Sequence, residues 1–122
     1  MIPDPFTARR AQLIDYFGGD SVSEKHLPDG RHLFRIAAVR LPTGCTPPSI
    51  PVLLVYANPQ AVPEVLVKPG IRLASGKVPR NMNPATIDGE PWSSFSANCP
   101  WNPSESIGMY VLRRVWRFRQ SD

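Results

Sequence analysis

The sequence is poor in the residues that most often carry chemistry: its 122 residues include only two cysteines and two histidines. A secreted domain held by disulfides usually has more cysteines, so Cys45 and Cys99 form at most one bridge. His26 and His32 flank a turn, far in sequence from either cysteine, and make a weak set of metal ligands. We therefore predict neither a metal ion nor a cofactor.

Long apolar runs and familiar nucleotide or metal motifs are also missing. No window approaches the roughly eighteen apolar residues of a membrane span, and the first residues lack the charged start and apolar run of a signal peptide. The sequence contains no phosphate-binding glycine loop, dinucleotide fingerprint or paired-cysteine motif. These absences predict a cytoplasmic protein with no membrane partner.

Proline, in contrast, is abundant, with 15 residues against about six expected from average usage. Because proline cannot donate to a sheet ladder and breaks helix interiors, this favours a sheet-rich chain with many loops. Hydrophobic residues make up 42% of the sequence, enough for a core, and the length is typical of one domain. We expect residues 1–122 to form a single domain.

The net charge of +4 is ordinary for a small domain. Much of the excess lies near the C-terminus, where arginines oppose the negative end of a helix dipole: Arg113, Arg114, Arg117 and Arg119. We therefore expect no nucleic-acid partner, and RNA binding by this segment stays a remote alternative.

Both ends of the chain have helix signals. Near the N-terminus, Asp4 is placed to cap a helix and Pro5 to occupy its first position, and Gly18 and Gly19 end it. Its predicted apolar face consists of Phe6, Leu13, Ile14 and Phe17. Near the C-terminus, Asn102, Pro103 and Glu105 predict a capped start. The apolar stripe that follows consists of Ile107, Val111, Val115 and Phe118, widened by Leu112 and Trp116.

Between the helices, branched and aromatic residues predict four strands, over residues 22–27, 32–41, 51–56 and 64–67. Their short connections favour an antiparallel meander. Residues 70–101 show no periodicity, and a loop this long inside a compact domain is generally functional or misassigned. The fold class is therefore α+β: N-terminal helix, four-stranded meander, long loop, C-terminal helix.

The loop ends in the only constellation with a chemical interpretation. Cys99 lies just ahead of the predicted C-terminal helix, whose dipole lowers a thiol pKa, and Asn98 could donate to an oxyanion. By residue chemistry alone the plainer interpretation is favoured, with Cys99 a small buried hydrophobe, because no histidine is nearby in sequence as a base. We interpret Cys45 as a structural thiol.

The ordered motifs resemble those of the ubiquitin-conjugating superfamily, specifically its prokaryotic family E, from about residue 30 to residue 118. Leu41-Pro42-Thr43-Gly44 is similar to a family Leu-Pro-x-Gly. Asn58-Pro59 and Val62-Pro63 are similar to its proline-containing strand step. Further matches are Leu73-Ala74-Ser75-Gly76-Lys77-Val78-Pro79, then Trp92 with Phe95-Ser96, and Trp101-Asn102-Pro103.

This resemblance implies a protein that accepts a ubiquitin-like modifier from an adenylating activating enzyme and passes its C-terminal carbonyl to an amine. Bacterial members resemble one another in setting, beside activating enzymes, ubiquitin-like proteins and JAB-type peptidases in operons suspected of phage defence. By the same analogy, Arg9 and Arg10 would face the activating enzyme. Trp92, Phe95 and Trp101 would bind the modifier, with Trp92 and Trp101 shaping a groove for its tail.

The sequence departs from the family at the nucleophile. The His-Pro-Asn signature is absent, and the eukaryotic cysteine spacing lands on Ser93. Cys99 lies late, as in the autophagy conjugating enzymes, and is our first choice of nucleophile, with Asn98 steadying the tetrahedral intermediate. Ser93 or Ser96, forming an oxyester, is the second choice. A non-catalytic module that binds a ubiquitin-like protein or another partner is the third.

Overall fold

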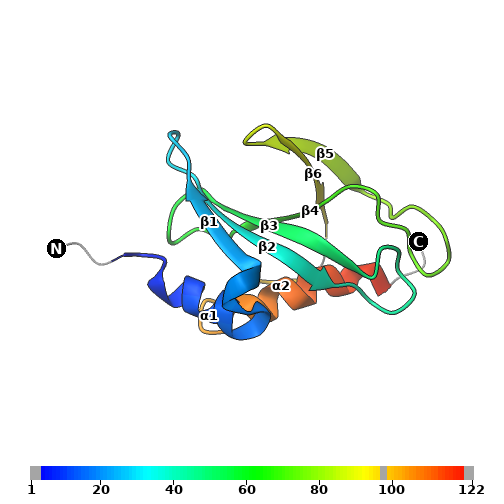
Figure 1. The fold of residues 1–122 in the computed structure, drawn as a ribbon, viewed down its shortest axis with the longest axis horizontal. Helices are drawn as coiled ribbons and strands as arrows, with labels where there is room; N and C mark the ends of the chain where they lie inside the picture. Colours follow the sequence, from blue (N-terminus) through cyan, green and yellow to red (C-terminus); the bar gives the residue numbers. More distant parts are fainter. Residues whose placement is uncertain (1–3, 97–98, 120–122) are drawn as a thin grey trace.

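The computed structural model describes residues 4–96 and 99–119. It confirms an α+β architecture with a helix at each end and an antiparallel sheet between them (Figure 1). The sheet has six strands, in the spatial order β1-β2-β3-β4-β6-β5. In chain order the elements are α1 (Thr7–Phe17), η1 (Gly19–Ser21), β1 (Val22–His26), β2 (His32–Arg40), β3 (Ser49–Tyr56), β4 (Glu64–Val67), β5 (Met82–Ile87), β6 (Glu90–Phe95), α2 (Ile107–Val115) and η2 (Trp116–Arg119).

The four predicted strands form the predicted meander. The strands β1 to β4 pair in sequence order and antiparallel, with β4 at the predicted bounds and β2 one residue shorter than predicted. A register shift between Ile36 and Val39 bends β2 against β3. Residues 52–56 of β3 are all buried, as expected for a central strand covered on both faces.

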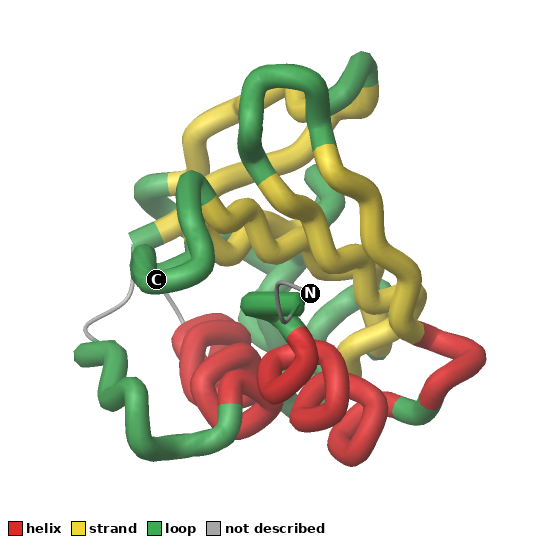
Figure 2. The backbone as a smooth tube through the Cα atoms, turned by 90° about the vertical axis from the view of Figure 1, so that its left-hand side faces the viewer, coloured by secondary structure: helices red, strands yellow, loops and turns green. Residues whose placement is uncertain are grey.

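Both helices cover one face of the sheet (Figure 2). The largest cluster of apolar side chains lies between the helices and this face. We call this cluster the main core. Its fully buried members include Leu13 of α1, Phe34 and Ile36 of β2, Val52 and Leu54 of β3, and Ile107 and Val111 of α2. None of the helices within the described ranges is long and apolar enough to cross a bilayer.

The prediction of one long loop over residues 70–101 is wrong, because residues 82–95 form a hairpin of β5 and β6. Asp88 (φ 52°) and Gly89 (φ 78°) make its two-residue turn, in which both central residues have the positive φ of a type I′ turn. Strand β6 then pairs with β4 through Leu66–Ser94 and Val67–Ser93. The four-stranded sheet thus becomes six-stranded, and the hairpin curls over the face away from the helices (Figure 1).

That face holds a second, smaller cluster, which we call the outer cluster. Trp92 of β6 belongs to this cluster and is 2% exposed. Because alternate residues of a strand point to opposite faces, it lies on the face away from Phe95, which is in the main core. The other members of the outer cluster are Leu27, Leu33, Leu53, Val55, Leu66 and Ile87. The sheet therefore has apolar packing on both faces.

Both helices begin later than the sequence predicts. The α1 helix starts at Thr7, because Asp4 caps the turn before it, accepting from the Phe6 amide at 2.9 Å while Phe6 turns into the main core. In α2 the cap is Ser106, whose Oγ accepts from the Gly108 amide at 3.2 Å. Asn102 closes a preceding turn instead, accepting from the Ser104 amide.

The predicted apolar faces are correct for most of their members. Phe6 and Leu13 are buried, as are the four residues of the α2 stripe: Ile107, Val111, Val115 and Phe118. Ile14 and Trp116 are the exceptions, at 41% and 55% exposed, because neither points toward the sheet.

Candidate functional site

Cys99 lies in the segment that joins β6 to α2. Its side chain is half-buried and packs against the edge of the main core, as does that of Trp101. The predicted partner Asn98 lies outside the described residues. Cys99 is therefore the more accessible of the two thiols, since Cys45 is only 6% exposed.

Two aromatic rings and the Arg9 guanidinium lie together in this segment and beside it. The Trp101 ring meets the Tyr110 ring edge-on, with centroids 5.0 Å apart, and the Arg9 guanidinium lies 4.9 Å above Trp101. Arg9 also donates to the Pro103 carbonyl at 3.4 Å, which ties α1 to the segment. Burial raises the pKa of Tyr110, and a charge on Cys99 adds to the rise, so this thiol and phenol are electrostatic neighbours.

Tyr56 lies at the end of β3, in the main core, and is 1% exposed. Among the described residues its hydroxyl has no hydrogen-bond partner. Burial raises the pKa of Tyr56 to about 12, although the charge on Arg9 acts in the opposite direction. Tyr56 is therefore a neutral phenol at physiological pH.

Three arginines of the last helical turns hold the two sides of the Cys99 segment. Arg114 donates to the Phe95 carbonyl at 2.9 Å, and Arg117 donates to the Ser96 carbonyl at 3.3 Å. On the other side of Cys99, Arg113 donates to the Pro100 carbonyl at 3.2 Å and forms an ion pair with Glu105. These arginines thus cross-link backbone carbonyls, in addition to the predicted interaction with the helix dipole.

The candidate serines occupy different environments. Ser93 is 7% exposed, on the face of β6 that also carries Phe95, and it lines a hollow of about 260 Å³ together with Ile71 and Met82. Ser96 is exposed, immediately after β6. Ser93 is thus poorly placed for a protein-sized acyl donor, whereas Ser96 is open to solvent.

The predicted binding aromatics do not form one group. Phe95 packs in the main core, with its ring centroid 4.9 Å from that of Phe118. Trp92 lies on the opposite face, in the outer cluster, where Arg35 and Lys68 approach its ring at 5.3 and 4.5 Å. The structure brings Trp101 to Cys99 but leaves Trp92 across the sheet from them.

The arginines assigned by analogy to the activating enzyme make contacts within the chain. Arg10 donates to Glu24 and, at 2.8 Å, to Asp4, and these hydrogen bonds raise its pKa. Arg9 donates to Gln12 and Pro103, as well as lying over Trp101. Both side chains are only half-buried, so part of each remains on the surface.

Cys45 has the structural position that the sequence predicts. Its Sγ donates to the Phe118 carbonyl at 3.4 Å, and burial raises its pKa. Both cysteines are free thiols. His26 and His32 contact each other through their Nδ1 atoms at 3.3 Å, and the described ranges contain no group of three or more metal-ligating side chains close enough to share an ion.

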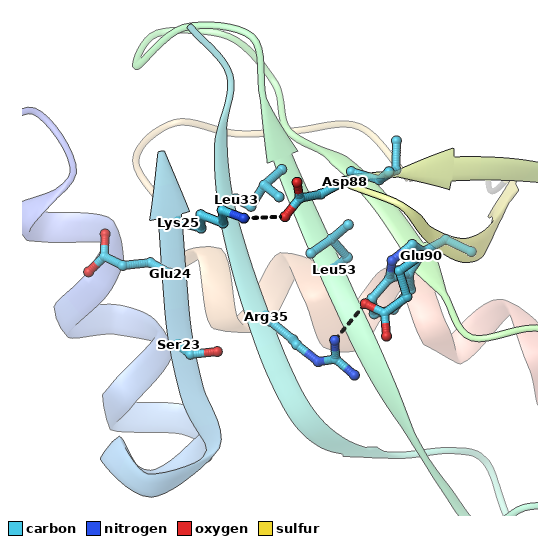
Figure 3. Close-up of a pocket in the computed structure, with 10 residues that line it drawn as sticks. Ser23, Glu24, Lys25, Leu33, Arg35, Leu53, Asp88 and Glu90 are labelled. Atoms are coloured by element: carbon cyan, nitrogen blue, oxygen red, sulfur yellow. Dashed lines mark hydrogen bonds and ion pairs between the residues drawn. The ribbon is translucent and has the colours of Figure 1, made fainter. Parts of the chain in front are cut away.

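A second candidate site lies on the outer face, where β1 and the β5–β6 turn bound a cavity of about 200 Å³ (Figure 3). Leu33, Leu53 and Trp92 line it, and two ion pairs cross its rim: Lys25–Asp88 at 2.7 Å and Arg35–Glu90 at 2.6 Å. Each of these rim cations already has an acidic partner.

Sequence reasoning missed this cavity because it missed the hairpin. The available signal was Asp88-Gly89, a dipeptide strongly preferred in two-residue hairpin turns. Pro84 and Pro91 argued against strands on either side of it, yet Pro84 lies on an edge strand and Pro91 near the start of β6, positions where proline is tolerated.

Comparison with protein-family models, with curated proteins and with solved structures finds no match for this chain.

Proposed function

We propose that this protein is an acyl carrier of the ubiquitin-conjugating type, which accepts the C-terminal carbonyl of a ubiquitin-like modifier on Cys99 and transfers it to an amine. The finer fold assignment, a ubiquitin-conjugating-like domain, is part of the same proposal. The motif order supports it, as does the arrangement of two terminal helices about an antiparallel meander.

The observation that carries the proposal is the placement of Cys99. A nucleophile that receives a protein must be accessible and held. Cys99 is half-buried, and the flanking carbonyls of Phe95, Ser96 and Pro100 accept hydrogen bonds from arginines of α2 and η2. Positioning of this kind lowers the entropic cost of bringing thiol and carbonyl together.

The reaction exchanges one thioester for another. The Cys99 thiolate attacks the modifier's carbonyl carbon, the bond to the activating enzyme's sulfur breaks, and that sulfur takes up a proton. An incoming amine then attacks the Cys99 thioester, forms an amide, and regenerates the thiol. Asn98 would steady the tetrahedral oxyanion in each step.

Two alternatives use the same fold. An oxyester on a serine is more plausible at Ser96, which is exposed, than at Ser93, which is 7% exposed. A binding module without turnover is favoured by the cavity beside Trp92 on the outer face, which we call the outer cavity. Its apolar floor and charged rim form a site independent of any nucleophile.

The test supplies the protein with ATP and with an adenylating activating enzyme and a ubiquitin-like modifier encoded in the same genome. We expect an adduct that thiols cleave, that Cys99→Ala abolishes, and that Cys45→Ala leaves intact. A simpler probe is a peptide thioester ending in Gly-Gly, with the modified residue located by mass spectrometry.

The other outcomes each overturn the Cys99 assignment. An adduct that resists thiols but yields to hydroxylamine, and that disappears in Ser96→Ala, would assign the oxyester. Absence of any adduct, together with binding of the unmodified modifier, would assign the binding module.

A further inference from the structure

The end of the molecule that holds the β2–β3 loop, the β4–β5 loop and the last helical turns is strongly basic. Residues 40–48, 69–82 and 106–119 contain none of the ten acidic residues and eight of the fourteen cationic ones: Arg40, Arg72, Lys77, Arg80, Arg113, Arg114, Arg117 and Arg119. These segments meet in space (Figure 1). Thr46 forms an isolated antiparallel β-bridge with Arg72, and the Cys45 Sγ donates a hydrogen bond to the Phe118 carbonyl.

Seven of the eight cations at this end, all but Arg80, fall into two groups. Arg113, Arg114 and Arg117 are committed to backbone carbonyls around Cys99, and Arg113 also to Glu105. Arg40, Arg72, Lys77 and Arg119 are exposed and form no ion pair within residues 4–96 and 99–119. This second group is available to an outside anion.

An apolar hollow of about 350 Å³ lies beside one of these cations, Arg40, between the end of α2 and the β2–β3 loop. Leu41, Pro42, Leu112 and Val115 line it, and Arg40 and Trp116 are at its rim. Trp116 is 55% exposed, and the Arg119 guanidinium lies 5.5 Å from its ring centroid. Exposed tryptophan and arginine next to an apolar pocket are the composition of an interface hot spot.

We propose that this hollow is a docking site for an acidic segment of a partner protein, which inserts one large apolar side chain and places carboxylates against Arg40 and Arg119. The charge of the surrounding loops, with no acid in them, selects a negative partner. An aliphatic floor selects an apolar side chain over a base, because leucine, valine and proline offer no hydrogen bonds to base edges. The exposed Trp116 ring at the rim is a surface on which a base can stack, so an oligonucleotide is the competing ligand in the test. This site is independent of the acyl-transfer proposal.

The experiment measures fluorescence anisotropy of labelled twelve-residue peptides of aspartate and glutamate with a central Leu, Phe or Trp. The matched peptide has serine at the centre, and a labelled twelve-nucleotide oligo(dT) tests the alternative polyanion. The protein variants are Trp116→Ala, Arg40→Gln and Thr43→Phe. Thr43 also lines the hollow, so the larger phenylalanine side chain takes up space there without changing charge. Arg31→Gln, in the distant β1–β2 turn, is the control for loss of one positive charge.

We expect at least one apolar-centred peptide to bind at least tenfold more tightly than its serine-centred match. Trp116→Ala and Thr43→Phe should each weaken this binding about tenfold and Arg40→Gln severalfold, with Arg31→Gln within twofold of wild type. Circular dichroism checks that every variant is folded.

Three results would overturn the proposal. They are equal binding of the serine-centred peptides, binding that Thr43→Phe leaves unchanged, and absence of peptide binding at millimolar concentration. Oligo(dT) binding that exceeds peptide binding and ignores Thr43→Phe would instead assign this end to a nucleic acid.

Discussion

At the crossing of the two helices, Gly108 of α2 lies directly against the ring of Tyr16 from α1. A Cβ added to Gly108 would come within 2.4 Å of the Tyr16 Cγ atom and 2.8 Å of its Cβ. These atoms are close to the backbone and cannot swing away as a side-chain end can. The missing side chain at Gly108 is therefore what lets α1 and α2 approach.

Gly108→Ala should lower the free energy of unfolding by up to about 2 kcal/mol. The overpacking cost, about 1–3 kcal/mol, outweighs the roughly 1 kcal/mol that alanine gains over glycine in a helix. Urea denaturation of the single variant and of a Tyr16→Ala background tests this, because the loss should be smaller once the ring is removed and only the 2.8 Å contact with the Cβ of residue 16 remains. A loss of equal size in both backgrounds would contradict the contact.

Tyr56→Phe should stabilise the protein by about 1 kcal/mol at neutral pH, because it removes a buried hydroxyl that has no partner among the described residues. The advantage should grow in alkali. The pKa of Tyr56 is about 12 in the folded chain against an ordinary value near 10, so the unfolded chain loses this proton first.

The stability that protonated Tyr56 contributes is thus complete below pH 10 and is lost as the pH rises to 12, by about 3 kcal/mol in all. Denaturation of wild type and Tyr56→Phe at pH 8, 10 and 12 measures this difference. Parallel curves across that range would show that the hydroxyl titrates at its ordinary pKa.

At the scale of elements, the β5–β6 hairpin depends on its turn. Gly89 has φ 78°, and a Cβ built there would meet nothing within 4 Å, so any cost of substitution is conformational. Asp88 has φ 52° and also holds Lys25 across the outer cavity. The turn thus sets both the hairpin and the rim of the cavity.

Gly89→Ala should cost about 1–2 kcal/mol of unfolding free energy, the usual cost of a left-handed conformation for a residue with a Cβ. Asp88→Asn should cost less than about 1 kcal/mol, since asparagine tolerates this conformation and an exposed ion pair contributes little. Thermal and urea unfolding compare the two. A larger loss for Asp88→Asn would assign the stability of the turn to its ion pair.

The elements that local patterns predicted well are those whose signals are complete within a few residues. Strand β4 has its predicted bounds, and the α2 stripe is buried as expected, because a short run of branched residues and helical spacing are local properties. The helix starts were less predictable. Asn102 and Ser106 are both residue types that cap helices well. The path of the chain after Trp101 decides that Asn102 closes a turn and Ser106 caps α2.

At the scale of the whole molecule, the sheet separates two apolar clusters. Two of the tryptophans, Trp92 and Trp116, differ sharply in their exposure to solvent. Trp92 is 2% exposed in the outer cluster, whereas Trp116 is 55% exposed at the basic end. The sequence placed Trp116 on the buried stripe of the last helix. The outer cluster was not predicted at all.

Trp92→Ala should therefore cost about 3–5 kcal/mol, a large share of the roughly 5–15 kcal/mol that stabilises a typical domain. Trp116→Ala should change stability by less than about 0.5 kcal/mol, as for other exposed positions. Urea denaturation followed by far-ultraviolet circular dichroism measures both. Similar losses for the two variants would contradict the placement of these side chains.

The sequence alone determined the α+β class, the meander and the two terminal helices, and it singled out Cys99 as the candidate nucleophile. Periodicity, turn residues and position along the chain are local information, which is why these features could be read from it. Only the tertiary structure decided that residues 82–95 extend the sheet, that Trp92 lies across the sheet from Trp101, and that arginines of the last turns bind the Cys99 segment. Each of these depends on contacts between residues far apart in sequence, whose energies are settled by packing of the whole chain.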